Sequence, residues 1–331
     1  MRRLLALVAF ALTLLGSDVS ARGHNMGKLE AFQKSDGLTN KQVNSPTLNR
    51  YYLGGAFSPG LKDLAKYPEK WAHTATKSGY WMHPMGFSAA EKEGFIQELL
   101  SKYAHKSYVY EMDLMGWTDG TNKIQTNFPW CWASGAEGVR GLEEIDPSYK
   151  MAFYAADVGG ERVADSLEDV TDRYRQLKAK MSSRNYNNSY FFYSPADPGS
   201  LQRMDTLLNK RAGNLSFVDY VVTKAGLQGI ALDFPAGLWM ATKFPPSFPP
   251  NSCENAKRLA KQAYEICKRH GIPLVWVFNG GDADTAEAKK SIEKYGIYPS
   301  AYVVDNFSKP NRTGVPETDP ASMSGQVFQM L

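Results

Sequence analysis

Residues 229–234 read GIALDF, residues 273–278 read PLVWVF, and the segment between them has the pattern of a helix. Both runs are short and rich in β-branched and aromatic residues, as buried strands are. From Ser252 to His270, apolar residues recur at helical spacing, and the basic last turn is followed by Gly271, a residue typical of helix ends. This stretch is therefore predicted to form a strand–helix–strand unit, in which a crossover helix joins two parallel strands.

The same alternation continues along the rest of the chain. Further runs with strand character are YYLGGAF (51–57), GYWMHPM (79–85), YVYEMDL (108–114), MAFYAADV (151–158), SYFFYSP (189–195) and AYVVDNF (301–307). About eight strands alternating with helices are typical of a (β/α)8 barrel. A doubly wound open sheet is the competing architecture, but no GxGxxG motif follows a predicted strand. We therefore expect a single barrel domain over residues 50–331.

Helix starts and irregular segments complete this division. The capping box from Ser88 to Glu91 opens one predicted helix, and Ser166 begins another. The helix from Ser252 is the third, and Asp284 opens a fourth, which ends before Gly296. The longest irregular insertion runs over residues 117–146, and a proline-rich one covers residues 243–251.

The amino-terminal segment has the features of an export signal. A basic start is followed by an apolar run from Leu4 to Leu15 and by small residues up to Ala21. The run is shorter than the roughly 20 residues of a membrane span, so residues 1–21 are predicted to be a signal peptide. Residues 22–49 are expected to form a polar linker or strap. We thus expect a secreted protein without stable membrane insertion.

Charge and cysteine content exclude several classes of function. The net charge is +4 with both signs mixed along the chain, so no nucleic-acid surface is predicted. The three cysteines, Cys131, Cys253 and Cys267, do not have the spacing of a metal knuckle. Neither a cofactor nor a metal site is predicted from these features.

Polar residues collect where the predicted strands end. In a (β/α)8 barrel, active sites lie at the carboxyl-terminal ends of the strands, where the loops converge. There the sequence carries mainly carboxylates and no nucleophile motif such as GxSxG. The candidates are His83, Glu111, Asp113, Asp157, Asp197, Asp233, Asn279 and Asp305.

A ring of carboxylates suits glycoside hydrolysis, in which one carboxylic acid protonates the leaving oxygen and a second acts as nucleophile or base. We expect these two roles to fall to Asp233 and to one of Glu111 or Asp113. Aromatic faces suit sugar rings, which favours a carbohydrate substrate. The other expected sugar contacts are His83, Asp157, Asn279, Asp305, Trp117, Trp130 and Trp239.

Structural interpretations remain open for the same residues. Glu111 and Asp113 are also consistent with a buried pair bonded to Arg140 or Lys123, and Asp233 with a turn before Pro235. A non-catalytic glycan-binding barrel would use the strand-end acids only as hydrogen-bond acceptors.

Glu317 is a further candidate, able to reach back over the barrel mouth or to start a helix near the carboxyl terminus.

The order His83, then Glu111-Met112-Asp113, then Asp119-Gly120 resembles the metal-binding start of the glycerophosphodiester phosphodiesterase family. The sequence departs from that pattern where Pro84-Met85 follows the histidine instead of Arg-Gly. It also has no histidine soon after Asp119-Gly120. The resemblance implies an alternative function, a metal-dependent phosphodiesterase in which His83, Glu111 and Asp113 hold the metal.

Overall fold

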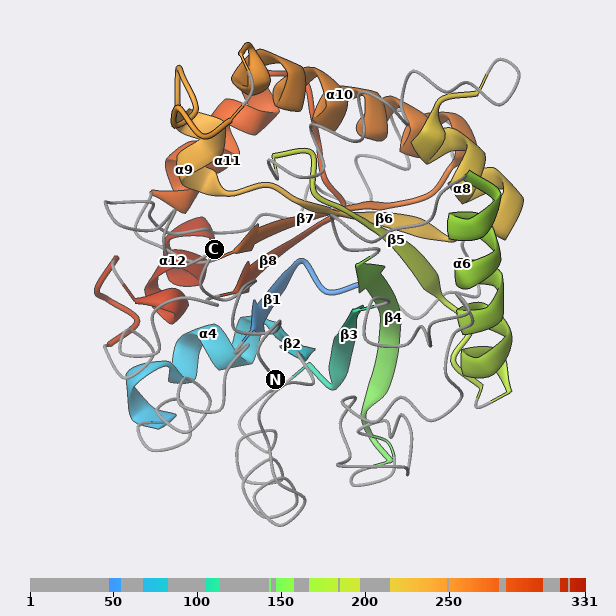
Figure 1. The fold of residues 1–331 in the computed structure, drawn as a ribbon. Helices are drawn as coiled ribbons and strands as arrows, with labels where there is room; N and C mark the ends of the chain where they lie inside the picture. Colours follow the sequence, from blue (N-terminus) through green and yellow to red (C-terminus); the bar gives the residue numbers. More distant parts are fainter. Residues whose placement is uncertain are drawn as a thin grey trace, which may run out of the picture.

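Eight parallel strands close into a barrel in simple chain order (Figure 1). They are β1 (Tyr51–Gly54), β2 (Gly79–Met82), β3 (Ser107–Asp113), β4 (Lys150–Asp157), β5 (Ser189–Tyr193), β6 (Gly229–Asp233), β7 (Leu274–Asn279) and β8 (Ala301–Asp305). Each strand pairs with the next, and β1 pairs with β8 to close the ring. All eight predicted strands are present, and the predicted (β/α)8 barrel is confirmed.

This computed structural model describes residues 48–54, 68–82, 105–113, 143, 147–157, 167–183, 185–196, 215–248, 250–279, 284–305, 316–320 and 322–331. The predicted signal peptide, nearly all of the predicted linker, the helix expected from Ser88 and nearly all of the insertion at 117–146 lie outside these residues. Within the described part, no helix is long and apolar enough to cross a membrane.

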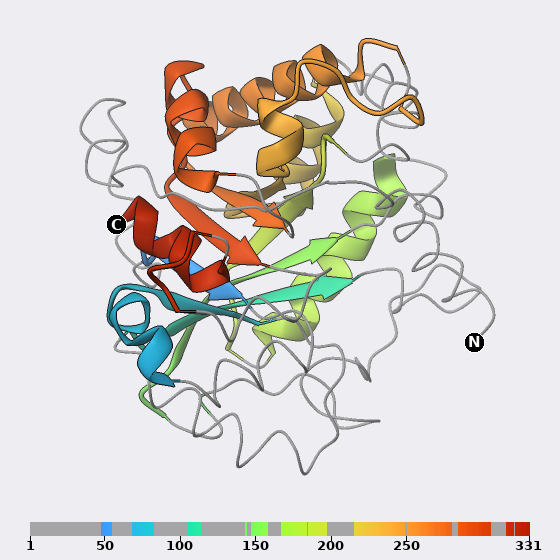
Figure 2. The same cartoon turned by 90° about the vertical axis from the view of Figure 1, so that its left-hand side faces the viewer.

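Helices surround the strands, as Figures 1 and 2 show. They are α4 (Ala72–Lys77), α6 (Leu167–Ser182), α8 (Phe217–Ala225), α9 (Ala236–Met240), α10 (Ser252–His270), α11 (Thr285–Lys294) and α12 (Met323–Met330), with a 3-10 turn, η2, at Pro68–Lys70. The helix starts predicted at Ser252 and Asp284 are confirmed. Asp284 caps α11 by accepting a hydrogen bond from the Glu287 amide. Gly271 and Gly296 adopt the left-handed conformation that ends α10 and α11.

Aromatic rings fill the barrel interior. Phe153 stacks on Tyr190 with ring centroids 3.9 Å apart, and Tyr52 and Trp81 each contact Phe153 edge-on. All four side chains are almost fully buried. Gly229 makes room for them, because a β-carbon there would lie 2.5 Å from the Tyr190 ring. The interior is therefore a packed core, with aromatic rings where such barrels more often use branched aliphatic residues.

The carboxyl-terminal segment is hydrogen-bonded to β1 and to the start of α4. The Tyr51 hydroxyl donates to the Met330 carbonyl at 2.6 Å. Glu317 caps α4, accepting hydrogen bonds from the His73 amide at 3.1 Å and from the amide and hydroxyl of Thr74, each at 2.7 Å. Glu317 is therefore a helix-start acid, the second of its two alternatives, although the helix that it caps is α4 and not one near the carboxyl terminus.

Candidate active site

The strand register places acidic residues side by side at the carboxyl-terminal end of the barrel. Asp113, the last residue of β3, pairs with Asp157, the last residue of β4. Asn279 and Asp305 pair in the same way at the ends of β7 and β8. Glu111 lies two residues before Asp113 and therefore on the same face of β3. The predicted collection of polar strand ends is thus present in the backbone arrangement.

Asp305 occupies space that a glycine leaves open. A β-carbon on Gly54 would lie 3.0 Å from both Cγ and Oδ1 of Asp305, and 3.0 Å from Cδ1 of Trp81. Asp305 is 1% exposed and Trp81 is fully buried. The Asp305 carboxylate and the Trp81 ring therefore both border the space beside Gly54.

Asp233 ends β6 and is only partly buried. Its Oδ2 lies 3.4 Å from the hydroxyl of Ser194, the residue that directly follows β5. The pairing of Tyr193 with Leu232 brings these strand ends together. A hydroxyl that donates to a carboxylate favours its charged form. The Ser194 hydroxyl is thus a neighbour of the Asp233 carboxylate at the carboxyl-terminal end of the barrel.

The floor below these acids is closed. Among the described residues, Tyr52, Trp81, Phe153 and Tyr190 fill the interior beneath the acidic strand ends. Burial raises the pKa of Tyr52 to about 12, and hydrogen bonds with Ser107 and with the Asn49 amide offset only part of this effect. The floor is thus uncharged at neutral pH.

Several predicted contact residues cannot be placed in this site. His83, Trp117, Trp130 and Asp197 lie outside the described residues. For Glu111, Asp113, Asp157 and Asn279 the description covers the backbone position in the strand.

Trp239 lies in the core, which disagrees with its expected role as a sugar platform. It is 2% exposed, and its indole nitrogen donates to the Ser291 hydroxyl at 3.0 Å. Phe234, Trp276 and Tyr295 each contact its ring edge-on, with centroids 5.3 Å away. Its ring is therefore used for packing between β7, α9 and α11, and we leave Trp239 out of the site.

Ser194 and Gly54 were not predicted from the sequence. Both have a signal in hindsight: Ser194 follows the SYFFY strand directly, and Gly54 ends the first strand in a Gly-Gly pair. Among the residues that the structure describes, no group of three His, Cys, Asp or Glu side chains is placed to hold a metal ion.

Comparisons with known proteins give only distant likenesses. No protein-family model matches the sequence, and no curated protein is significantly similar to it. A mutant of methylaspartate ammonia lyase from Clostridium tetanomorphum has a similar structure, with a TM-score of 0.42 and 5% identity. That match covers 91% of this chain but only 62% of the lyase chain.

The homocysteine methyltransferase MmuM from Escherichia coli matches with a TM-score of 0.41 and 11% identity, over 86% of this chain and 97% of its own. We draw no functional argument from either likeness. The barrel itself is seen directly in the strand pairing.

Proposed function

We propose that this protein is a secreted enzyme that hydrolyses glycosidic bonds at the carboxyl-terminal end of its barrel. One observation carries the proposal: four of the eight strands, β3, β4, β6 and β8, end in aspartate at the same end of a closed barrel. Glycoside hydrolysis needs two carboxyl groups on either side of the scissile bond. A ring of strand-end acids above a closed floor can supply such a pair.

Asp233 and one of Glu111 or Asp113 are the proposed catalytic pair. Strands β3 and β6 are three positions apart in an eight-stranded ring, so their ends lie on facing sides of the mouth. The nearby Ser194 hydroxyl supports Asp233 as the ionised member, which attacks the anomeric carbon or takes a proton from water. The acid on β3 then protonates the leaving glycosidic oxygen.

The remaining strand-end residues are proposed to bind the sugar. Asp157 and Asn279 stand beside Asp113 and Asp305 in the register, and carboxylates and amides accept hydrogen bonds from hydroxyl groups. Asp305, held in the space beside Gly54, is the proposed acceptor nearest to β1.

The test is hydrolysis by the purified chain from Arg22 onward on a panel of polysaccharides and on glycerophosphocholine, each with and without a chelator. We expect release of sugar ends that the chelator does not affect. Asp233→Asn and Glu111→Gln should each lower the rate by about 10²- to 10⁴-fold, since each removes one proton-transfer or nucleophilic group. Asp172→Asn, at an exposed acid of α6 paired with Arg175, is the matched control and should keep full activity.

Other outcomes would replace the proposal. Chelator-sensitive cleavage of glycerophosphocholine would assign Glu111 and Asp113 to metal binding, as the phosphodiesterase resemblance implies. Saturable sugar binding without turnover, unchanged in Asp233→Asn, would indicate a glycan-binding barrel.

A further inference from the structure

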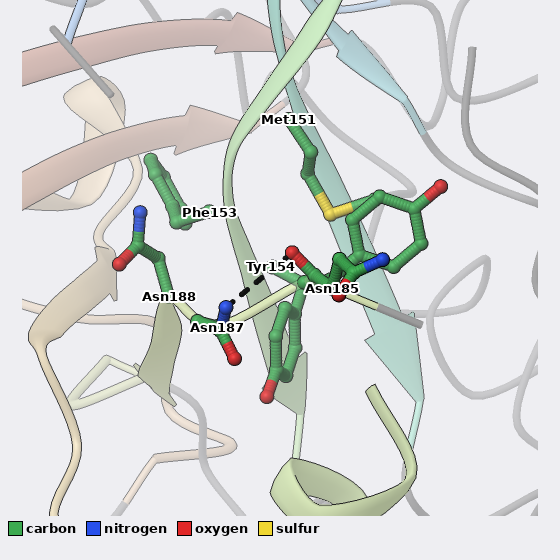
Figure 3. A pocket seen from close by; sticks show the side chains of 7 residues that line it. Met151, Phe153, Tyr154, Asn185, Asn187 and Asn188 are labelled. Atoms are coloured by element: carbon green, nitrogen blue, oxygen red, sulfur yellow. Dashed lines mark hydrogen bonds between the residues drawn. The ribbon is translucent and has the colours of Figure 1, made fainter. Parts of the chain in front are cut away.

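A pocket lies at the opposite, amino-terminal end of the barrel, where β4 extends beyond β5. The first residue pair between these strands is Tyr154 with Ser189, so residues 150–153 of β4 have no partner in β5. The chain that leads into β5 passes there instead. The Asn188 side chain donates to the Ala152 carbonyl at 2.9 Å, and the Tyr154 amide donates to the Asn188 carbonyl at 3.0 Å. The overhang leaves a pocket of about 190 Å³ (Figure 3).

The lining of this pocket is uncharged. It consists of amide groups from three asparagines at positions 185, 187 and 188, aromatic rings from Tyr154 and Tyr186, and the apolar side chains of Met151 and Phe153. Phosphate and carboxylate ligands are normally held by arginine, lysine or clustered backbone amides. A lining without charged side chains favours a neutral ligand.

Two polar groups of the pocket are poorly used by the protein itself. The Asn187 side chain is exposed and, among the described residues, donates only a long hydrogen bond, 3.5 Å, to the Asn185 carbonyl (dashed in Figure 3). The Tyr154 hydroxyl is buried and makes no hydrogen bond of normal geometry with the described residues. Burial raises the pKa of Tyr154, and the neighbouring Ser189 hydroxyl offsets only part of this, so Tyr154 keeps its proton at neutral pH. Buried polar groups normally have partners, and one without invites a ligand or a water.

We propose that this pocket binds one neutral sugar unit, at a site separate from the acids at the other end of the barrel. Amide groups both donate and accept hydrogen bonds, as the hydroxyls of a sugar require. The partly exposed ring of Tyr186 offers flat apolar surface for the carbon face of the same unit. The volume is below the roughly 300 Å³ at which pockets for drug-sized ligands begin, which suits a single ring.

The experiment uses chain from Arg22 onward produced in the bacterial cytoplasm, so that Asn187, in the acceptor sequence Asn187-Asn188-Ser189, carries no glycan. Glucose, galactose, mannose, xylose and N-acetylglucosamine are titrated by calorimetry and by saturation-transfer NMR. A ligand of about a dozen heavy atoms is expected to bind with a Kd in the roughly millimolar range.

Asn187→Ala is the decisive variant, because its exposed amide makes only a long hydrogen bond among the described residues. We expect sugar affinity to fall several-fold without loss of folding. Tyr154→Phe removes the hydroxyl of a side chain that is 0% exposed and should change affinity less than Asn187→Ala does. Tyr220→Phe is the matched control: it removes a tyrosine hydroxyl bonded to Glu168 on the helical layer and should leave affinity unchanged.

The proposal is overturned if no neutral sugar binds, or if binding is the same in Tyr154→Phe, Asn187→Ala and wild type. It is also overturned if glucose 6-phosphate binds there more tightly than glucose, because the lining would then prefer an anion. The readout is equilibrium binding and needs no turnover. A protein that binds sugar here but hydrolyses nothing would refute only the proposed catalytic function.

Discussion

The two ends of the barrel differ in the residues that terminate the strands. At the carboxyl-terminal end, β3, β4, β6 and β8 all finish in aspartate. At the amino-terminal end the strands begin with small, apolar or hydroxyl-bearing residues, and Lys150 is the one charged residue among the eight starts. The same eight strands therefore end in four aspartates on one side and begin with a single charged residue on the other; we call these the acidic end and the neutral end.

This difference indicates a division of tasks. Charged carboxylates are costly to bury, so their concentration at one end of a barrel needs water, a ligand or hydrogen-bond partners to compensate. The aromatic rings of Tyr52, Phe153 and Tyr190 lie below them and keep the interior apolar. In the proposed function, the acidic end carries the chemistry and the neutral end supplies stability. Substitutions at the neutral end should therefore change mainly stability, and those at the acidic end mainly activity.

The largest effect on stability is expected for Gly229→Ala, at the neutral end. The added methyl group would lie 2.5–2.7 Å from three ring atoms of Tyr190, and that ring cannot move away because it is stacked on Phe153. Overpacking of this kind should lower the free energy of unfolding by about 3 kcal/mol, measured by urea denaturation.

The double variant Gly229→Ala/Tyr190→Leu provides the control. Its destabilisation should be less than the sum of the two single effects, because the smaller side chain removes the clash. Strict additivity would mean that the Tyr190 ring is not what excludes the methyl group.

A somewhat smaller effect is expected from alkaline pH. Burial raises the pKa of Tyr52 to about 12 in the folded protein, whereas an unfolded tyrosine titrates near 10. The folded state therefore keeps a proton that the unfolded state releases. The contribution of Tyr52 is fully present below pH 10 and is lost as the pH rises from 10 to 12. At about 1.4 kcal/mol per pH unit, the free energy of unfolding should fall by about 2–3 kcal/mol over this interval.

Comparison with Tyr52→Phe isolates this contribution. The variant also loses the contacts with the Asn49 amide and Ser107, so it should be less stable at pH 8. Its stability should nevertheless decline less steeply above pH 10, as measured by urea denaturation at several pH values. Parallel curves for the two proteins would show that Tyr52 ionises equally easily in both states.

Much of the fold could be predicted from the sequence, because strands buried on both faces produce short continuous apolar runs. The acids at the strand ends could also be predicted, because they directly follow these apolar runs in the sequence. Helix α8 was not predicted, although Ser216, whose hydroxyl accepts from the Asp219 amide, and Gly226 mark its two ends. Its nine residues are mostly apolar, so the sequence lacks the clear alternation of apolar and polar residues that predicts a helix.

The role of each aromatic residue could not be predicted. Trp81 is the third residue of β2, whereas Trp239 lies in α9, the helix that follows β6; in the sequence both are tryptophans near the end of a predicted strand. Trp81 contacts the interior ring of Phe153, whereas Trp239 packs under α11 with its indole bonded to Ser291. Only the closure of the barrel decides which strand positions face inward, and that information is not local to either residue.

At the acidic end, Gly54→Ala should affect activity more than stability. The new methyl group would press on the Asp305 carboxylate and Trp81 at 3.0 Å, so one of them must shift by a few tenths of an ångström. If Asp305 contacts the substrate as proposed, its displacement should lower kcat/KM by about tenfold, while the unfolding free energy changes by about 1 kcal/mol.

Asp305→Asn in the Gly54→Ala background tests the cause. If the methyl group acts through the Asp305 carboxylate, its effect on kcat/KM should largely disappear once that carboxylate is replaced. A large loss of stability in Gly54→Ala with unchanged kcat/KM would instead place Gly54 with Gly229, as a packing residue.

The smallest effect is expected for Glu317→Ala, which removes an acid that caps a helix and does not end a strand. Glu317 binds the amides of His73 and Thr74 at the start of α4, where a negative charge also complements the helix dipole. Its loss should lower the free energy of unfolding by about 1 kcal/mol and leave kcat/KM unchanged. Glu317→Gln keeps one acceptor oxygen, so its free energy of unfolding should lie between those of the wild type and Glu317→Ala. A drop in kcat/KM at unchanged stability would place Glu317 among the functional acids, and the distinction between strand-end and helix-capping carboxylates would then fail.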